Sequence, residues 1–146
     1  VEVGGEIRTM GDKNGIGWLV GIDSPSDGNY TPGADIQVRI RLDDLALATS
    51  GNYRKFFIED GVKYSHTIDP RTGYPVRHTL LSATIIASTG AVADAWATAC
   101  MVGGLEQAVA FIEEFDFLEG YLIYSDETGE MKRWVSDGIR KMIISE

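Results

Sequence analysis

Hydrophobic and polar residues alternate along much of the first half of the chain. The clearest run covers residues 36–42, where Ile, Val and Leu alternate with Gln and Arg, and a period of two predicts a β-strand with one face toward water. The pairs Asp60–Gly61 and Thr128–Gly129 are typical of the tight turns of β-hairpins. On the same signals we expect further strands at residues 17–23, 56–59, 62–64, 81–87, 121–125 and 131–135.

The periodicity becomes helical in the second half of the chain. Small and apolar residues recur every three or four positions over 91–102, with Ser88 or Thr89 available as the N-cap and a Gly–Gly pair that predicts the end. A second helix is expected over 105–115, where apolar residues form one stripe. Strands grouped with strands and two adjacent helices predict an α+β fold with a mainly antiparallel sheet, a single domain over 1–146.

The chain is acidic. Its 146 residues include 13 Lys and Arg against 22 Asp and Glu, a formal net charge of −9. Nucleic-acid-binding proteins rely on clustered Lys and Arg, so this balance disfavours a nucleic-acid partner. No apolar run approaches the ~20 residues of a membrane-spanning helix. An acidic protein that binds a phosphorylated ligand needs a cation to offset the charge.

Two clusters of small residues interrupt the predicted elements. Gly4 and Gly5 fall inside a segment that otherwise has the pattern of a strand, which indicates either a β-bulge or a close approach of a ligand or another backbone. Thr49, Ser50 and Gly51 follow an apolar run and offer hydroxyl and backbone N–H donors suited to an anion or a flat ligand. A simple turn explains the second cluster equally well.

The segment 66–75 combines an imidazole, a carboxylate and a guanidinium with strong turn signals. Asp69, followed by Pro and later by Gly73, predicts a rigid turn. His66 carries the side chain best suited to move a proton near neutral pH, although a lone histidine is often structural. Both readings of His66 stay open at this point.

Asp94 and Thr98 lie four residues apart in the first predicted helix, and their side chains therefore share one face of it. A carboxylate and a hydroxyl are hard oxygen ligands of the kind Mg²⁺ accepts, with phosphates and water filling the other positions. The alternative is structural: a carboxylate favoured by the helix dipole, and a threonine that packs or bonds back to its own helix.

Four motifs in order, VEVGGEIR, ALATSGNY, YSHTIDPRTGYPV and ADAWATACMVGG, resemble those of the ApbE family, magnesium-dependent FMN transferases also called flavin-trafficking proteins. The resemblance covers most of the chain from residue 1 to about 104. It implies a T-fold-like domain of which this chain is the C-terminal part. Family members are longer, so we expect FAD to lie between this chain and residues upstream of it.

The resemblance also implies roles for individual residues. Asp94 and Thr98 match the magnesium ligands, and His66 matches the essential histidine, which Asp69 either orients as a catalytic partner or supports by anchoring the turn. The residues expected to line the FAD site are Gly4, Gly5, Thr49, Ser50, Gly51 and His66.

The implied activity is the Mg²⁺-dependent transfer of FMN from FAD onto a threonine or serine hydroxyl of an acceptor flavoprotein. Two alternatives remain: an FAD pyrophosphatase that yields FMN and AMP, and a flavin-binding module without turnover. The resemblance further implies an exported protein, periplasmic or anchored as a bacterial lipoprotein, and leaves a homodimer open.

Overall fold

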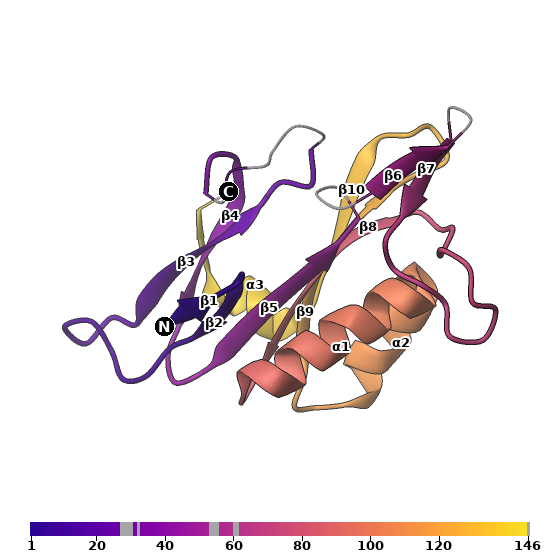
Figure 1. Ribbon diagram of the computed structural model, residues 1–146. Helices are drawn as coiled ribbons and strands as arrows, with labels where there is room; N and C mark the ends of the chain where they lie inside the picture. The colour runs from indigo at the N-terminus through magenta and orange to yellow at the C-terminus, as the bar shows by residue number, and fades with distance from the viewer. Residues whose placement is uncertain (27–30, 32, 53–55, 60–61, 146) are drawn as a thin grey trace.

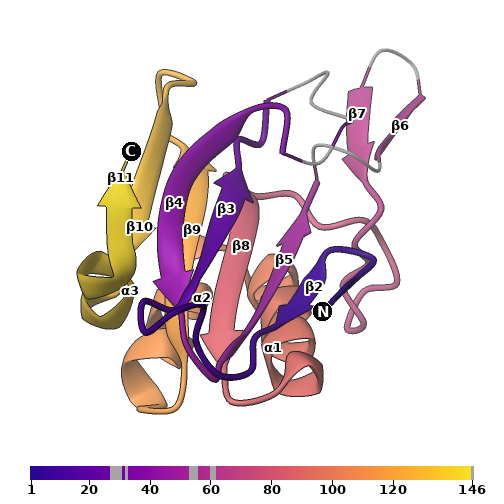
Figure 2. The ribbon, with the colours of Figure 1, turned by 90° about the vertical axis from the view of Figure 1, so that its left-hand side faces the viewer.

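The computed structural model describes residues 1–26, 31, 33–52, 56–59 and 62–145, and it has three layers (Figure 1). A six-stranded antiparallel sheet forms the middle layer. The helices α1 (Gly90–Gly103) and α2 (Leu105–Glu114) cover one face of this sheet. A three-stranded sheet and the short helix α3 (Asp137–Met142) cover the other face (Figure 2).

The six-stranded sheet has the order β1-β2-β5-β8-β9-β10, so β1 and β10 are its edges. Its strands are β1 (Glu2–Val3), β2 (Glu6–Arg8), β5 (Ala46–Gly51), β8 (Leu80–Ala87), β9 (Glu119–Ser125) and β10 (Met131–Val135).

The second sheet has the order β11-β4-β3, which leaves β3 at an edge. Its strands are β3 (Trp18–Asp23), β4 (Ile36–Leu42) and β11 (Ile143–Ser145). A separate two-stranded sheet pairs β6 (Phe56–Glu59) with β7 (Val62–Ser65). Among the described residues, no helix is both long enough and apolar enough to cross a membrane.

The strand at the centre of the middle layer shows why two cores form. Nearly all of β8 is buried, and its successive residues Ile85 and Ile86 contribute to different clusters. Ile85 packs toward the helices with Ala93 and Ala97 of α1, whereas Ile86 packs toward the second sheet. Because side chains alternate along a strand, a strand buried on both faces supplies both cores.

The expected α+β class, the two adjacent helices and the strand positions are confirmed. Thr89 caps α1 by accepting a hydrogen bond from the Val92 amide, and α1 ends before Gly104, whose φ is +79°. The hairpin around Gly129 forms as expected, whereas the predicted turn at 60–61 lies outside the described residues.

At three places the structure differs from, or adds to, what the sequence predicted. The segment that follows Leu45 is strand β5 rather than a turn, because it pairs with both β2 and β8. The Gly4–Gly5 pair is no bulge within one strand but the turn of a hairpin between β1 and β2. The hydrophobic pattern did not predict α3 and β11. Each is short and is stabilised by packing against strands that are distant in the sequence.

The packing of α1 gives a first prediction. Ala97 is completely buried against the sheet, whereas Ala95 on the same helix is exposed. Ala97→Leu should destabilise the fold by about 1–3 kcal/mol because the added methylenes overpack the interface. Ala95→Leu should change stability by less than about 0.5 kcal/mol. Thermal or denaturant unfolding of both variants checks this, and equal stabilities would contradict the tight packing of α1.

Candidate functional site

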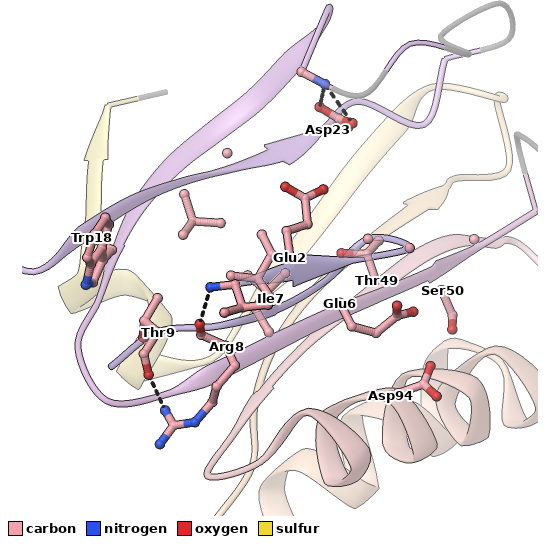
Figure 3. Close-up of a pocket in the computed structure, with 18 of the residues that line it drawn as sticks. Glu2, Glu6, Ile7, Arg8, Thr9, Trp18, Asp23, Thr49, Ser50 and Asp94 are labelled. Atoms are coloured by element: carbon pink, nitrogen blue, oxygen red, sulfur yellow. Dashed lines mark hydrogen bonds between the residues drawn. The ribbon is translucent and has the colours of Figure 1, made fainter. Parts of the chain in front are cut away.

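A cleft of about 1130 Å³ lies beside the β1–β2 hairpin (Figure 3). Residues of β3, of β5 and of α1 complete its lining, so it collects segments that are far apart in the sequence. Its volume slightly exceeds the range of about 300–1,000 Å³ that is typical of small-molecule and cofactor sites. It brings together all the residues that the sequence proposed for nucleotide or metal binding: Gly4, Gly5, Thr49, Ser50, Gly51, His66, Asp94 and Thr98.

The Gly4–Gly5 turn forms the end of the hairpin at the cleft. Both residues have positive φ, +67° and +108°, which L-residues with side chains adopt only with strain. A Cβ atom on Gly4 would also lie 3.1 Å from the Glu6 Oε2 atom. Glycine at position 4 therefore provides both the backbone conformation and the space for the Glu6 carboxylate.

Strand β5 places its hydroxyls on two faces of the sheet. Thr49 Oγ1 lies 2.8 Å from Thr84 Oγ1 on β8, whereas Ser50 Oγ lies 3.3 Å from Thr98 Oγ1 on α1. Consecutive side chains on a strand point to opposite faces. Ser50 is thus directed to the helix side of the sheet, and Thr49 to the side of the second sheet.

Helix α1 presents Asp94 and Thr98 on an exposed face, and buries Ala93 and Ala97 against the sheet. The first turn of α1 holds no acidic residue, so Asp94 does not act as the dipole partner considered above. Thr98 has the Ser50 hydroxyl as its partner instead of a carbonyl of its own helix. Asp94 and Thr98 both line the cleft on the exposed face of α1, where a ligand can reach them.

His66 follows β7 directly, is exposed, and lines the cleft together with Asp94 and Thr98. The residues after it form a closed loop: the Val76 amide donates to the Thr67 carbonyl at 3.0 Å, and the Gly73 amide to the Asp69 carbonyl at 2.8 Å. His66 therefore stands at the base of a loop with its own internal hydrogen bonds.

Asp69 is not among the residues that line the cleft. Its carboxylate accepts hydrogen bonds from Arg71 Nε at 3.0 Å, from Arg71 Nη2 at 2.9 Å and from the Arg71 amide at 2.9 Å. The side-chain hydrogen bond to Arg71 is the main cause that holds the pKa of Asp69 below its ordinary value. Asp69 was expected either to orient His66 or to anchor the turn, and these contacts correspond to anchoring the turn.

The remaining potentially reactive side chains lie elsewhere. His78 Nε2 is 2.7 Å from the Met101 carbonyl near the end of α1, which is a structural contact. Cys100 is buried in the helix-side core, and burial raises the pKa of its thiol to about 12. A thiol that stays protonated at neutral pH is a poor nucleophile.

The sequence did not single out most of the charged groups in the cleft. Three further carboxylates line it, those of Glu2, Glu6 and Asp23, together with one guanidinium, that of Arg8. Of these charged residues, Glu6 could have been recognised from the sequence as a candidate site residue, because it directly follows the Gly–Gly pair. With Asp94, the described residues of the lining carry four carboxylates, and their charge repels a phosphate unless a cation is present.

The donor set fits a magnesium ion that binds together with a phosphate. Asp94 supplies a carboxylate, and Thr98 and Ser50 supply neighbouring hydroxyls. Among the described residues there is no group of three or more His, Cys, Asp or Glu side chains placed to enclose a metal ion. Magnesium commonly needs only one or two carboxylates, because water and substrate phosphates complete its coordination.

Comparisons with known proteins agree with these motifs. The sequence profile of the ApbE family matches residues 1–122. The FAD:protein FMN transferase of Escherichia coli K12 is 36% identical over 149 residues, covering 100% of this chain and 40% of the relative. The one from Vibrio cholerae serotype O1 is 42% identical over 114 residues, covering 77% of this chain and 33% of the relative.

Solved structures show the same fold. The flavin transferase ApbE from Vibrio cholerae has a TM-score of 0.78 at 34% identity, covering 97% of this chain and 43% of that one. The ApbE protein from Thermotoga maritima has a TM-score of 0.77 at 33% identity. The match covers 99% of this chain and 44% of the Thermotoga chain. This chain thus spans about 40% of the length of relatives such as the Escherichia coli protein.

The Asp69–Arg71 pair gives a prediction for the loop. At neutral pH, Asp69→Asn should speed hydrogen exchange of the Gly73 and Val76 amides, because the ion pair that braces the turn is lost. The pKa of Asp69 is lower in the folded protein than its ordinary value of 3.8. The ionised carboxylate therefore stabilises the fold fully at pH values above 3.8, and this stabilisation is lost as the pH falls through the lowered pKa.

The difference between Asp69→Asn and the parent protein should accordingly shrink in acid, and exchange measured across a pH series checks this. The control is Asp116→Asn, at an exposed residue outside the cleft, which should leave the loop amides unchanged. A pH-independent difference at the loop amides would contradict the assignment of Asp69 as a charged anchor.

Proposed function

This chain belongs to the ApbE family, and we propose that it forms part of an enzyme that transfers FMN from FAD to a threonine or serine hydroxyl of an acceptor protein with the aid of Mg²⁺. The relatives that it matches are named FAD:protein FMN transferases. The observation that carries the proposal is the presence of His66, Asp94, Thr98 and the small residues of β5 in one cleft.

The chain's own residues account for binding of the nucleotide. Gly4 and Gly5 have no side chains of their own and expose backbone at one wall, and Thr49, Ser50 and Gly51 offer hydroxyls and small volume at strand β5. The acidic lining cannot hold a pyrophosphate by itself. Asp94 and Thr98 would hold Mg²⁺, which when bound neutralises the phosphate oxygens and stabilises the leaving group.

His66 is suited to the proton transfer. In the proposed reaction the hydroxyl oxygen of the acceptor attacks the FMN phosphorus of FAD, and its proton passes to the His66 imidazole. A phosphoester bond to the acceptor forms while the bond between that phosphorus and the bridging oxygen breaks, and AMP leaves with the electron pair. Imidazole is the side chain best suited to act as a general base at neutral pH.

One observation favours a second candidate reaction at the same site. His66 is exposed to solvent, so water can reach the position of the acceptor hydroxyl. Attack by water would release FMN and AMP, which is the pyrophosphatase reaction. Product analysis with FAD, Mg²⁺ and an acceptor protein separates the cases: covalent flavin on the acceptor, free FMN with AMP, or unchanged FAD, the last of which indicates a binding module.

Asp94 provides the test of the metal site. Asp94→Asn keeps the size of the side chain but removes the charge, and should weaken Mg²⁺ binding in the presence of FAD by at least ~10-fold, with a matching loss of activity at low Mg²⁺. Calorimetric titration of Mg²⁺ measures this. Asp116→Asn removes an exposed charge outside the cleft and should have no effect. Unchanged Mg²⁺ affinity in Asp94→Asn would refute the metal assignment.

His66 provides the test of proton transfer. His66→Ala should slow transfer by about 100-fold or more, the usual contribution of a positioned base, while the unfolding temperature stays near that of the parent. The reason is that His66 is exposed and the loop is held by other residues. The control His78→Ala should instead lower the unfolding temperature, since His78 contacts the Met101 carbonyl. A stable His66→Ala variant with full activity would exclude the role of base.

A further inference from the structure

The carboxylate of Glu6 lies on the same side of the sheet as Asp94. The register of β2 with β5 pairs Ile7 with Leu47, and continuing this register puts Glu6 beside Ala48. Ile7 packs with the core toward the second sheet, so its neighbour Glu6 points to the opposite face. Ala48 on that face belongs to the core beneath α1, which confirms that Glu6 faces the helix side.

The nearest polar groups on this face are those of the candidate metal site. Ser50 lies two residues along β5 from Ala48 and thus on the same face, with its Oγ 3.3 Å from Thr98 Oγ1. Asp94 is one helical turn before Thr98. Figure 3 shows the side chains of Glu6, Ser50 and Asp94 directed into the same part of the cleft, whereas Glu2 points toward β3.

Neither carboxylate has a protein partner that would explain its position. Within the described part of the chain, no hydrogen bond or ion pair involves the side chain of Glu6 or of Asp94. The Glu6 carboxylate lies next to Gly4, since a Cβ atom at position 4 would be 3.1 Å from Glu6 Oε2. Two carboxylates on one face of a cleft repel one another without a cation, and together with the neighbouring hydroxyls they favour a divalent ion.

We propose that Glu6 supplies a second carboxylate to the cation site of Asp94 and Thr98, an inference that rests on the proposed function. The cation would then connect the β1–β2 hairpin to α1. Strands β1 and β2 have only 2 and 3 residues, and β1, at the edge of the sheet, pairs with β2 alone. Binding of Mg²⁺ therefore also orders the wall of the cleft that carries Gly4 and Gly5.

The test uses Glu6→Gln in the protein as it is naturally produced, with Glu2→Gln as the matched control. Glu2 lies in the same hairpin and lines the same cleft, so the control removes an equal charge. Calorimetry measures Mg²⁺ affinity with FAD present, and FAD affinity without metal. We expect Glu6→Gln to weaken Mg²⁺ binding by at least ~10-fold and Glu2→Gln by much less.

FAD binding without metal distinguishes a cation ligand from a direct contact to the nucleotide. If Glu6 binds the cation, Glu6→Gln removes only a repulsive charge, and metal-free FAD affinity stays equal or rises. If Glu6 accepts a hydrogen bond from FAD, affinity falls to the same extent with and without Mg²⁺, and the proposal is overturned. A second expected result is that Mg²⁺ slows hydrogen exchange of residues 1–8 in the parent but not in Glu6→Gln.

The Asp94→Asn variant separates failure of this proposal from failure of the proposed function. If Asp94→Asn loses Mg²⁺ affinity while Glu6→Gln keeps it, the metal site stands and the role of Glu6 is wrong. If neither variant affects Mg²⁺ binding, the metal site itself is wrong, and both proposals are refuted.

Discussion

The close approach of α1 to the six-stranded sheet is the constraint on which the rest of the site depends. The helix turns Ala93 and Ala97 toward the sheet, and both are completely buried. Small side chains allow the helix backbone to lie near the strands, and this is why Ser50 Oγ on β5 comes to 3.3 Å from Thr98 Oγ1. Larger residues on that face would move the helix away and separate the two hydroxyls.

Charge in the cleft opposes stability and serves binding. Among the described residues, the four carboxylates of Glu2, Glu6, Asp23 and Asp94 line one cavity with the guanidinium of Arg8, so the arrangement is unfavourable in the empty protein. The large cores on the two sides of the middle sheet offset such a local cost. The same negative charge repels a free anion. In the proposed function, the cleft therefore selects a phosphate that carries a bound metal ion.

His66, the proposed proton-transfer group, is positioned by a separate loop. His66 stands at the base of a loop that is closed by backbone hydrogen bonds and braced by the pair of Asp69 and Arg71. This loop does not depend on the alanine face of α1, although both elements reach the same cleft. The proposed metal ligands and the proposed base are therefore placed on different elements, and substitutions in one should leave the geometry of the other intact.

The sequence by itself determined what local periodicity and local turn chemistry encode. Alternation marked the strand Ile36–Leu42, helical spacing and the Gly–Gly pair marked α1, and the Asp–Pro and Gly signals marked the loop after His66. The tertiary structure alone decided that Ala46–Gly51 is a strand, and that Gly4–Gly5 turns a hairpin. Such short segments take their conformation from the strands they pair with. The hydrophobic pattern within a short segment does not determine which strand it pairs with, or in what register. For the same reason only the fold showed that Asp69 does not line the cleft, and that Glu6 shares a face with Asp94.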